Sequence, residues 1–261
     1  MKIATWNIAG IRARIETLLS WLKEYDPDIV CLQEIKAEEK NFPFQPIEDL
    51  GYHIEIFGQK AFNGVAILSK KTPDEIIKNI PNNENDPQAR FLEAVFSSKE
   101  GSFRVCCLYA PNGNPIESEK YTYKLEWMKK FITYAQHRIS FKEPIFLAGD
   151  FNIIAQNIDA KKPEIWKNDA LFQPEVREFF FQLTNAGYYD AVRAYSDEPS
   201  YTFWDFQKQA FAKDNGIRID YFLISPEAMD LLKKTETQKS MRAVNKPSDH
   251  VPVLLELEMT F

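Results

Sequence analysis

Polar side chains that could bind a cation and a phosphate stand where short apolar segments of this sequence begin or end. Five follow such a segment: Asn7, Glu34, Tyr109, Asp150 and Asn152. Three precede one: Asp220, Asp249 and His250. A single carboxylate or amide at such a place is most often a turn former or a helix cap. Together the eight groups, which include one of only 3 histidines in the chain, predict a shared site.

Hydrolysis of a phosphodiester is the chemistry that this set of side chains suits. Mg²⁺ prefers carboxylate oxygens and water, so Glu34 is the leading candidate ligand, followed by Asp249 and Asn7. An aspartate can act as the general base, and an amide or an imidazole can stabilise developing charge on the phosphate. A second carboxylate can fix the tautomer of the imidazole. The side chains that fit these last roles are Asp150, Asn152, His250 and Asp220.

Eight apolar segments predict the strands that position these groups. They are KIATW, DIVCLQ, GVAILS, FLEAVF, FRVCCLYA, PIFLAG, IDYFLIS and VPVLLEL. Apolar residues at helical spacing predict helices around 15–22, 125–135 and 176–183. Segments 70–90 and 155–172 are polar and lack periodicity, which predicts long surface loops. The pattern indicates one domain over residues 1–261, an α+β or mixed α/β sandwich with helices outside the sheets.

A shared site puts a constraint on the topology. The polar groups can meet at one edge only if the strands that begin at residues 220 and 251 run antiparallel to the four that end in polar groups. Asp150 and Asn152 are two positions apart, so at an extended strand end both would point to the same face.

Composition narrows the class of protein. The chain has 32 basic and 38 acidic residues, a formal net charge of −6, which excludes a protein that coats nucleic acid by bulk positive charge. Cys31, Cys106 and Cys107 lie in apolar segments and suggest no disulfide framework, so we expect a reduced, cytoplasmic protein. The N-terminus lacks signal-peptide features, and no apolar run reaches membrane-spanning length.

Seven segments in order resemble the exonuclease III family of abasic-site endonucleases, within the endonuclease/exonuclease/phosphatase superfamily. They are WNIAG (6–10), LQEIK (32–36), YAPNGN (109–114), GDFN (149–152), YTFWDF (201–206), GIRIDYFLIS (216–225) and KPSDHVPV (246–253). The resemblance implies a four-layer αββα sandwich with two mixed sheets. It also implies a Mg²⁺-dependent enzyme, for which Mn²⁺ can substitute. Such an enzyme acts as a monomer on double-stranded DNA in base excision repair, cleaving 5′ to abasic sites to leave a 3′-OH and processing blocked 3′ ends.

The resemblance also implies roles for individual residues. Metal ligands are expected among Asn7, Glu34, Asp150, Asn152, Asp249 and His250. Catalytic roles are expected for Tyr109, Asp150, Asn152, Asp220 and His250, with either Asp150 or His250 as the general base. Phosphate contacts or orienting roles are expected for Lys36, Arg90 and Arg218, each of which could equally be a solvated surface charge. An apolar pocket for the bare sugar is expected from Phe203, Trp204, Ile217 and Ile219.

Alternatives within the same fold fit the sequence less well. An inositol-polyphosphate phosphatase would carry an arginine soon after the GDxN segment, where this chain has Ile153 and Ile154. A sphingomyelinase or a DNase I-like enzyme would usually be exported. A non-catalytic DNA-binding or scaffold protein would have lost some of the eight polar groups. The YTFW segment resembles the eukaryotic-type enzymes, which makes a strong 3′ exonuclease activity a less secure expectation.

Overall fold

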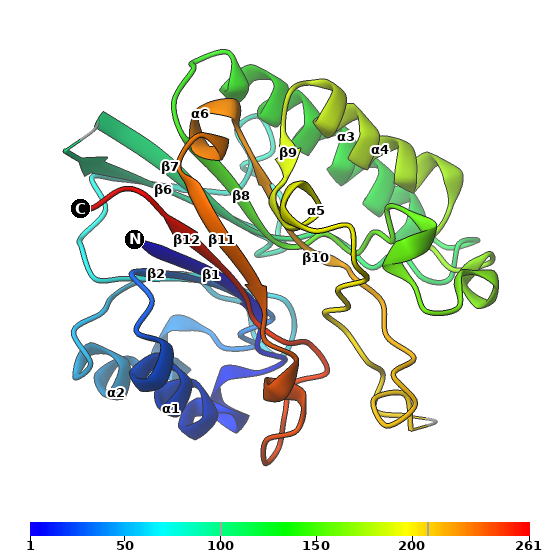
Figure 1. Cartoon of the computed structure of the whole chain (residues 1–261), viewed down its shortest axis with the longest axis horizontal. Helices are drawn as coiled ribbons and strands as arrows, with labels where there is room; N and C mark the ends of the chain where they lie inside the picture. Colours follow the sequence, from blue (N-terminus) through cyan, green and yellow to red (C-terminus); the bar gives the residue numbers. More distant parts are fainter. Residues whose placement is uncertain (100, 208) are drawn as a thin grey trace.

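The computed structural model describes residues 1–99, 101–207 and 209–261. Two mixed sheets stack face to face, with helices on their outer faces (Figure 1). One has the strand order β11-β12-β1-β2-β4-β3 and the other β5-β6-β7-β8-β10-β9. The predicted four-layer αββα sandwich is therefore confirmed.

The elements have the following bounds. The first sheet contains β1 (Lys2–Asn7), β2 (Ile29–Gln33), β3 (His53–Phe57), β4 (Val65–Ser69), β11 (Leu232–Thr237) and β12 (Val253–Leu257). The second contains β5 (Glu75–Lys78), β6 (Phe91–Ser98), β7 (Gly101–Tyr109), β8 (Ile145–Asp150), β9 (Tyr189–Asp190) and β10 (Asp220–Ile224). The α-helices are α1 (Ile15–Tyr25), α2 (Phe44–Glu48), α3 (Glu119–Ile139), α4 (Pro174–Asn185), α5 (Ala191–Tyr195) and α6 (Pro226–Met229). Short 3₁₀ helices are η1 (Ile11–Ala13), η2 (Glu39–Asn41), η3 (Asn157–Asp159), η4 (Pro163–Trp166) and η5 (Lys239–Arg242).

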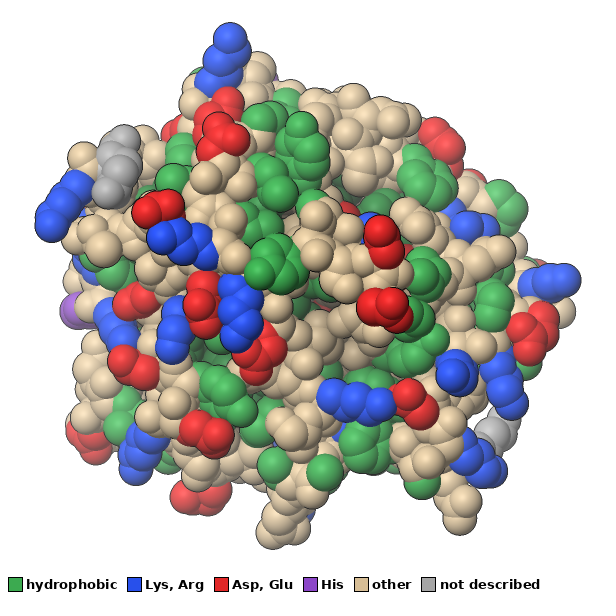
Figure 2. All heavy atoms as spheres, in the orientation of Figure 1, with side chains coloured by type: hydrophobic (Ala, Val, Ile, Leu, Met, Phe, Trp, Pro, Cys, Tyr) green, Lys and Arg blue, Asp and Glu red, His purple; other side chains and the backbone are tan. Residues whose placement is uncertain are grey.

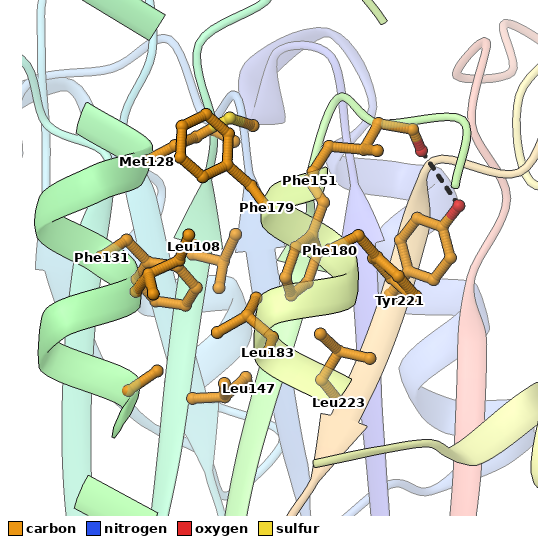
Figure 3. Packing of buried hydrophobic residues seen from close by; sticks show 14 of the residues in the cluster. Leu108, Met128, Phe131, Leu147, Phe151, Phe179, Phe180, Leu183, Tyr221 and Leu223 are labelled. Atoms are coloured by element: carbon orange, nitrogen blue, oxygen red, sulfur yellow. Dashed lines mark hydrogen bonds between the residues drawn. The ribbon is translucent and has the colours of Figure 1, made fainter. Parts of the chain in front are cut away.

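The central strands are buried on both faces because each sheet lies between its partner sheet and a helix layer. In β1, Ile3 packs into the core between the sheets, while Ala4 and Trp6 face the core under α1. The opposite outer core lies under α3 and α4, where Phe180 packs against Tyr221 of β10 and Phe131 lies beside Leu108 (Figure 3). Burial on both faces explains why these strands are continuous apolar runs.

The strand directions confirm the predicted topology. β1 runs parallel to β2, and β7 runs parallel to β8. β12 is antiparallel to β1, and β10 is antiparallel to β8. Asp220 at the start of β10 is therefore the register partner of Asp150 at the end of β8. The polar groups that end four strands and begin two others converge on one edge of the sandwich.

Two loop predictions need correction. The segment 70–90 is not one surface loop, because it contains β5, which pairs with β6, and the buried Ile80. The segment 155–172 contains η3 and η4, and its Ala160 and Leu171 are buried. Four strands, β3, β5, β9 and β11, lie outside the eight predicted segments. Each is an edge strand of its sheet, where exposed side chains can be polar.

The surface is mixed in charge on the face seen in Figure 2, where acidic and basic side chains are interspersed with apolar ones. In the part of the chain that the structure describes, no helix has both the length and the apolar character that a membrane crossing requires.

Candidate active site

An Asp–His–Asp chain is the centre of the convergent strand ends. His250 Nδ1 lies 2.8 Å from Asp220 Oδ2, and its Nε2 lies 3.8 Å from Asp150 Oδ2. All three side chains are buried. Burial alone would lower the pKa of His250, but the Asp220 and Asp150 carboxylates outweigh it and raise the pKa to about 10. Burial raises the pKa of Asp150 to about 7, although the His250 charge opposes that shift.

Two further strand ends bring Asn7 and Glu34 against this chain. The Asn7 amide nitrogen donates to Glu34 Oε1 at 2.9 Å and to Asp150 Oδ2 at 3.0 Å. Burial would raise the pKa of Glu34, but the Lys36 ammonium at 2.7 Å and the Asn7 amide lower it below its usual value. Ligand atoms of Glu34, Asp150 and His250 all lie within 4.8 Å of one another. This oxygen-rich group fits a hard divalent cation.

Tyr109 closes β7 beside the carboxylates. Burial next to Glu34 and Asp150 raises the pKa of its hydroxyl well above the usual range, so the phenol stays protonated and able to donate. The Arg90 guanidinium lies over the Tyr109 ring, 4.8 Å from the centroid, and donates to the Tyr109 carbonyl at 3.0 Å. Arg90 is 8% exposed, so it is not a solvated surface charge, and its orienting role toward Tyr109 stays a prediction.

Asn152 lies next to Asp150, but the cause is a turn and not an extended strand end. The strand ends at Asp150, and Asn152 has a left-handed backbone with φ 49°. Its backbone N–H donates to Asp150 Oδ1 at 2.9 Å, and its side chain bonds to Asn112 and to the Ala110 carbonyl. The argument from an extended strand end is therefore wrong here, and the turn is what keeps the two side chains together.

Lys36 and Asp249 lie at the rim of the site. Lys36 is half-exposed and paired with Glu34. The Asp249 carboxylate accepts a hydrogen bond from Ser248 Oγ at 3.3 Å and helps to raise the pKa of His250. Asp249 does not belong to the group of three ligand atoms that lie within 4.8 Å of one another.

An apolar cluster adjoins the catalytic edge. Phe203 bridges to both Ile217 and His250 in the backbone, and its ring centroid lies 4.9 Å from that of His250. Ile217 and Ile219 belong to the same cluster, as predicted. Trp166 and Phe172 pack there as well, and the sequence analysis missed them because they lie in a segment predicted to be a loop.

Two predicted substrate contacts are wrong. Trp204 is 1% exposed and belongs to the core cluster that contains Trp21 of α1, not to the cluster against which Phe203 packs. Arg218 is 1% exposed and ion-paired with Asp159 and Asp190, each at 2.8 Å or less, so it can neither reach DNA nor act as a surface charge. Arg218 belongs to this ion cluster, whereas its neighbours Ile217 and Ile219 belong to the apolar cluster around Phe203.

Polar positions that the sequence analysis did not single out hold the edge together. Ser248 Oγ donates to the Asn7 carbonyl at 2.7 Å and accepts from the His250 N–H, which ties the last turn to β1. Thr202 Oγ1 accepts from the N–H groups of Ile219 and Asp220 at 3.2 Å. Ser248 stands within the KPSDHVPV segment, so proximity to His250 was the one available signal.

This fold and this site define a class of hydrolase: an αββα sandwich with a buried Asp–His–Asp chain and a carboxylate group suited to a divalent cation. The chain belongs to the endonuclease/exonuclease/phosphatase family, which matches residues 4–250, and within it to the exonuclease III type. It is 35% identical to an exodeoxyribonuclease of Bacillus subtilis over 98% of both chains. Among solved structures it resembles the 3′ phosphatase NExo from Neisseria bound to a product DNA hairpin, with TM-score 0.94, 32% identity and 99% of each chain covered. It also resembles an AP endonuclease from Archaeoglobus fulgidus, with TM-score 0.93, 33% identity and 99% of each chain covered.

Proposed function

We propose that this protein is a metal-dependent DNA phosphodiesterase of base excision repair that cleaves 5′ to abasic sites, leaves a 3′-OH and also processes 3′ ends. One observation carries the proposal: the apolar cluster around Phe203 lies directly against His250. A site for a bare sugar next to the phosphate chemistry is what an enzyme for abasic DNA needs.

Mg²⁺ is the cation that we propose for the site, with Mn²⁺ as a substitute. Glu34 offers the oxygen ligand in this proposal, and the Asn7 amide is bonded to it. Asp249 at the rim is proposed to complete the ligand set, which leaves the Asp150 carboxylate free to act as a base. In the described ranges the three cysteines are buried in the core, so they provide no thiolate set for Zn²⁺ at this edge. When bound, the cation would stabilise negative charge on the phosphate.

Among the residues of the chain, we assign the general base to Asp150. His250, with its raised pKa, is a cation at neutral pH and is therefore suited to donate to a phosphate oxygen. Asp150, with its pKa raised to about 7, is close to the value at which a base both is ionised and accepts a proton readily. Asp220 fixes the imidazole by its contact with Nδ1. Tyr109 and Asn152 donate to the phosphate.

Recognition of the damaged site is assigned to the pocket, because every nucleotide carries the same phosphate. An abasic sugar has no base to unstack and costs less to extrude than a normal nucleotide. Phe203 forms the accessible wall in this proposal, together with the partly buried Trp166 and Phe172. Ile217 and Ile219, which are 1% and 2% exposed, pack behind Phe203 and support it. The substrate is double-stranded DNA with abasic sites or blocked 3′ ends.

The proposal extends to the state of the protein. Both sheets share the core that contains Ile3 and Val105, which supports a single catalytic domain over residues 1–261. The three free, buried thiols suit a reducing compartment, so we propose that the protein is cytoplasmic. We also propose that it acts as a monomer.

Cleavage assays on three substrates test this function. Purified protein is incubated with an abasic duplex, an intact duplex and an inositol phosphate, each with Mg²⁺ or with excess chelator. We expect incision of the abasic duplex 5′ to the lesion, only in the presence of the cation. Full activity in chelator would contradict the metal assignment, and preference for the inositol phosphate would contradict the DNA assignment.

A further inference from the structure

A fully buried lysine lies beneath the active site. Lys124 is on α3 and is 0% exposed. Its ammonium donates to three backbone carbonyls, those of Asn112 at 3.0 Å, Asn152 at 2.7 Å and Ala170 at 3.3 Å. An ammonium has three donors, so these bonds use all of them.

The three carbonyls come from three segments that meet at the site. Asn112 follows β7 and donates through its side chain to Asn152 Oδ1 at 3.2 Å. Asn152 follows β8 and has the left-handed backbone described above. Ala170 precedes Leu171 of the apolar cluster, whose carbonyl accepts from the Ile154 N–H at 2.8 Å. Lys124 therefore joins the turn that presents Asn152 to the wall of the pocket.

The surroundings are shaped to admit this lysine. A Cβ added at Gly113, which has φ +87°, would lie 2.6 Å from Lys124 Cδ, so the glycine leaves the space that the side chain uses. Lys124 is four residues before Met128 on the buried stripe of α3, where an apolar side chain would pack without the cost of desolvating a cation. That burial lowers the pKa of Lys124 to about 7, with the Asp150 and Asp169 charges opposing the shift.

We propose that Lys124 is a positioning residue, which holds the backbone of Asn152 so that its amide, which gives one N–H to the Ala110 carbonyl, keeps the other N–H for the scissile phosphate. The inference rests on the proposed role of Asn152. Asparagine adopts the left-handed backbone readily, so the Asn152 turn is not itself strained. The bond from Lys124 to the Asn152 carbonyl fixes the orientation of that turn relative to Asn112 and Ala170. A misplacement of about 1 Å can lower a rate about 10²-fold.

A double-mutant cycle tests the proposal. Lys124→Met removes the three donors and keeps the length of the side chain, and Asn152→Ala removes the amide. In the wild-type background we expect Lys124→Met to lower kcat on an abasic duplex by about 10-fold to 10²-fold, with a smaller change in KM. In the Asn152→Ala background the same substitution should change kcat less than about twofold, because its effect passes through the missing amide. Equal losses in both backgrounds would overturn the proposal.

Two further variants keep the test decisive. Gly113→Ala retains the ammonium and pushes it out of place, so it should show the same dependence on Asn152 even if Lys124→Met does not fold. Tyr188→Phe is the control, since it removes a buried hydrogen bond to the Ala135 carbonyl of α3 away from the site. Its effect should be the same in both backgrounds. If Asn152→Ala alone leaves turnover intact, the role of the amide in the proposed function is wrong; if Asn152→Ala acts and the cycle is additive, only the Lys124 inference is wrong.

Discussion

Two buried charged clusters have central residues that are only two positions apart in the sequence. One cluster surrounds Arg218, and the other surrounds Asp220. Arg218 donates from Nε to Asp159 and from both terminal nitrogens to Asp190 at 2.7 to 2.9 Å, so all its nitrogens are bonded. Asp220 bonds His250 through Oδ2, whereas its buried Oδ1 has no hydrogen-bond partner in the described part of the chain.

The difference shows how a structural ion cluster is told from a catalytic one. A second arginine, Arg193, also pairs with Asp159, so the first cluster balances its carboxylates with guanidinium groups. The second brings Asp220, Asp150 and Glu34 around a single histidine and a rim lysine. Excess buried carboxylate costs stability unless a cation offsets it. In this account, a cluster whose carboxylates and guanidinium groups balance has a structural role. A cluster with more carboxylates than cationic side chains is a site for a cation and a substrate.

The largest expected effect comes from the unbalanced cluster. Asp150→Asn and His250→Asn should each lower turnover on an abasic duplex by about 10²-fold or more, because a base or a phosphate donor is lost. The melting temperature should change little, because Asp150→Asn removes one of the excess buried carboxylates and His250→Asn keeps a side-chain N–H donor for the Asp220 carboxylate. Kinetics and thermal unfolding of the same preparations check this. Parallel loss of turnover and fold would assign these residues a structural role.

The balanced cluster should respond in the opposite way. Arg218→Met leaves the Asp159 and Asp190 carboxylates buried without their main partner, which should lower the free energy of unfolding by about 3 kcal/mol or more. Urea unfolding measures the loss, and turnover under conditions where the variant is folded should remain near that of the wild type. If Arg218→Met lost DNA binding and kept its stability, Arg218 would be a phosphate contact after all, and the structural role assigned here would be wrong.

These two clusters also show which features of the fold and the site can be predicted from the sequence. The inner strands, the three long helices and the edge that holds Asp150, Asp220 and His250 were predictable, because apolar runs and polar strand ends are local patterns. The burial of Arg218 in an ion cluster could not be predicted, because its partners Asp159 and Asp190 are 59 and 28 residues away in the sequence. For Lys124 the sequence offers one weak indication, which is a charged residue on the apolar face of a predicted helix.

A smaller effect is expected at the proposed cation ligand. Glu34→Ala should raise the Mg²⁺ concentration for half-maximal activity by about 10-fold, because one carboxylate ligand is lost. Titration of cleavage with Mg²⁺ checks it. Glu38→Ala is the matched control, since Glu38 pairs with Lys40 at the surface and should leave the titration unchanged. An unchanged midpoint for Glu34→Ala would remove Glu34 from the ligand set.

The smallest effect concerns the pocket beside His250. Phe203→Ala should lower cleavage at abasic sites several-fold more than trimming of 3′ ends, because in the proposed function the Phe203 side chain contacts the sugar and takes no part in the phosphate chemistry. Trp204→Phe is the control and should show no such preference, since Trp204 lies in the core under α1. Equal losses on both substrates for Phe203→Ala would show that Phe203 supports His250 and does not recognise the sugar.

The most direct test compares Asp220→Asn with Arg218→Met, two substitutions near the start of β10. Turnover on an abasic duplex with saturating Mg²⁺ and the free energy of unfolding in urea are measured on the same preparations. The charge-balance account predicts a crossed result: Asp220→Asn loses turnover by about 10²-fold and keeps its stability, whereas Arg218→Met loses stability and keeps its turnover. If both variants lose turnover and stability together, the distinction between the two clusters is wrong.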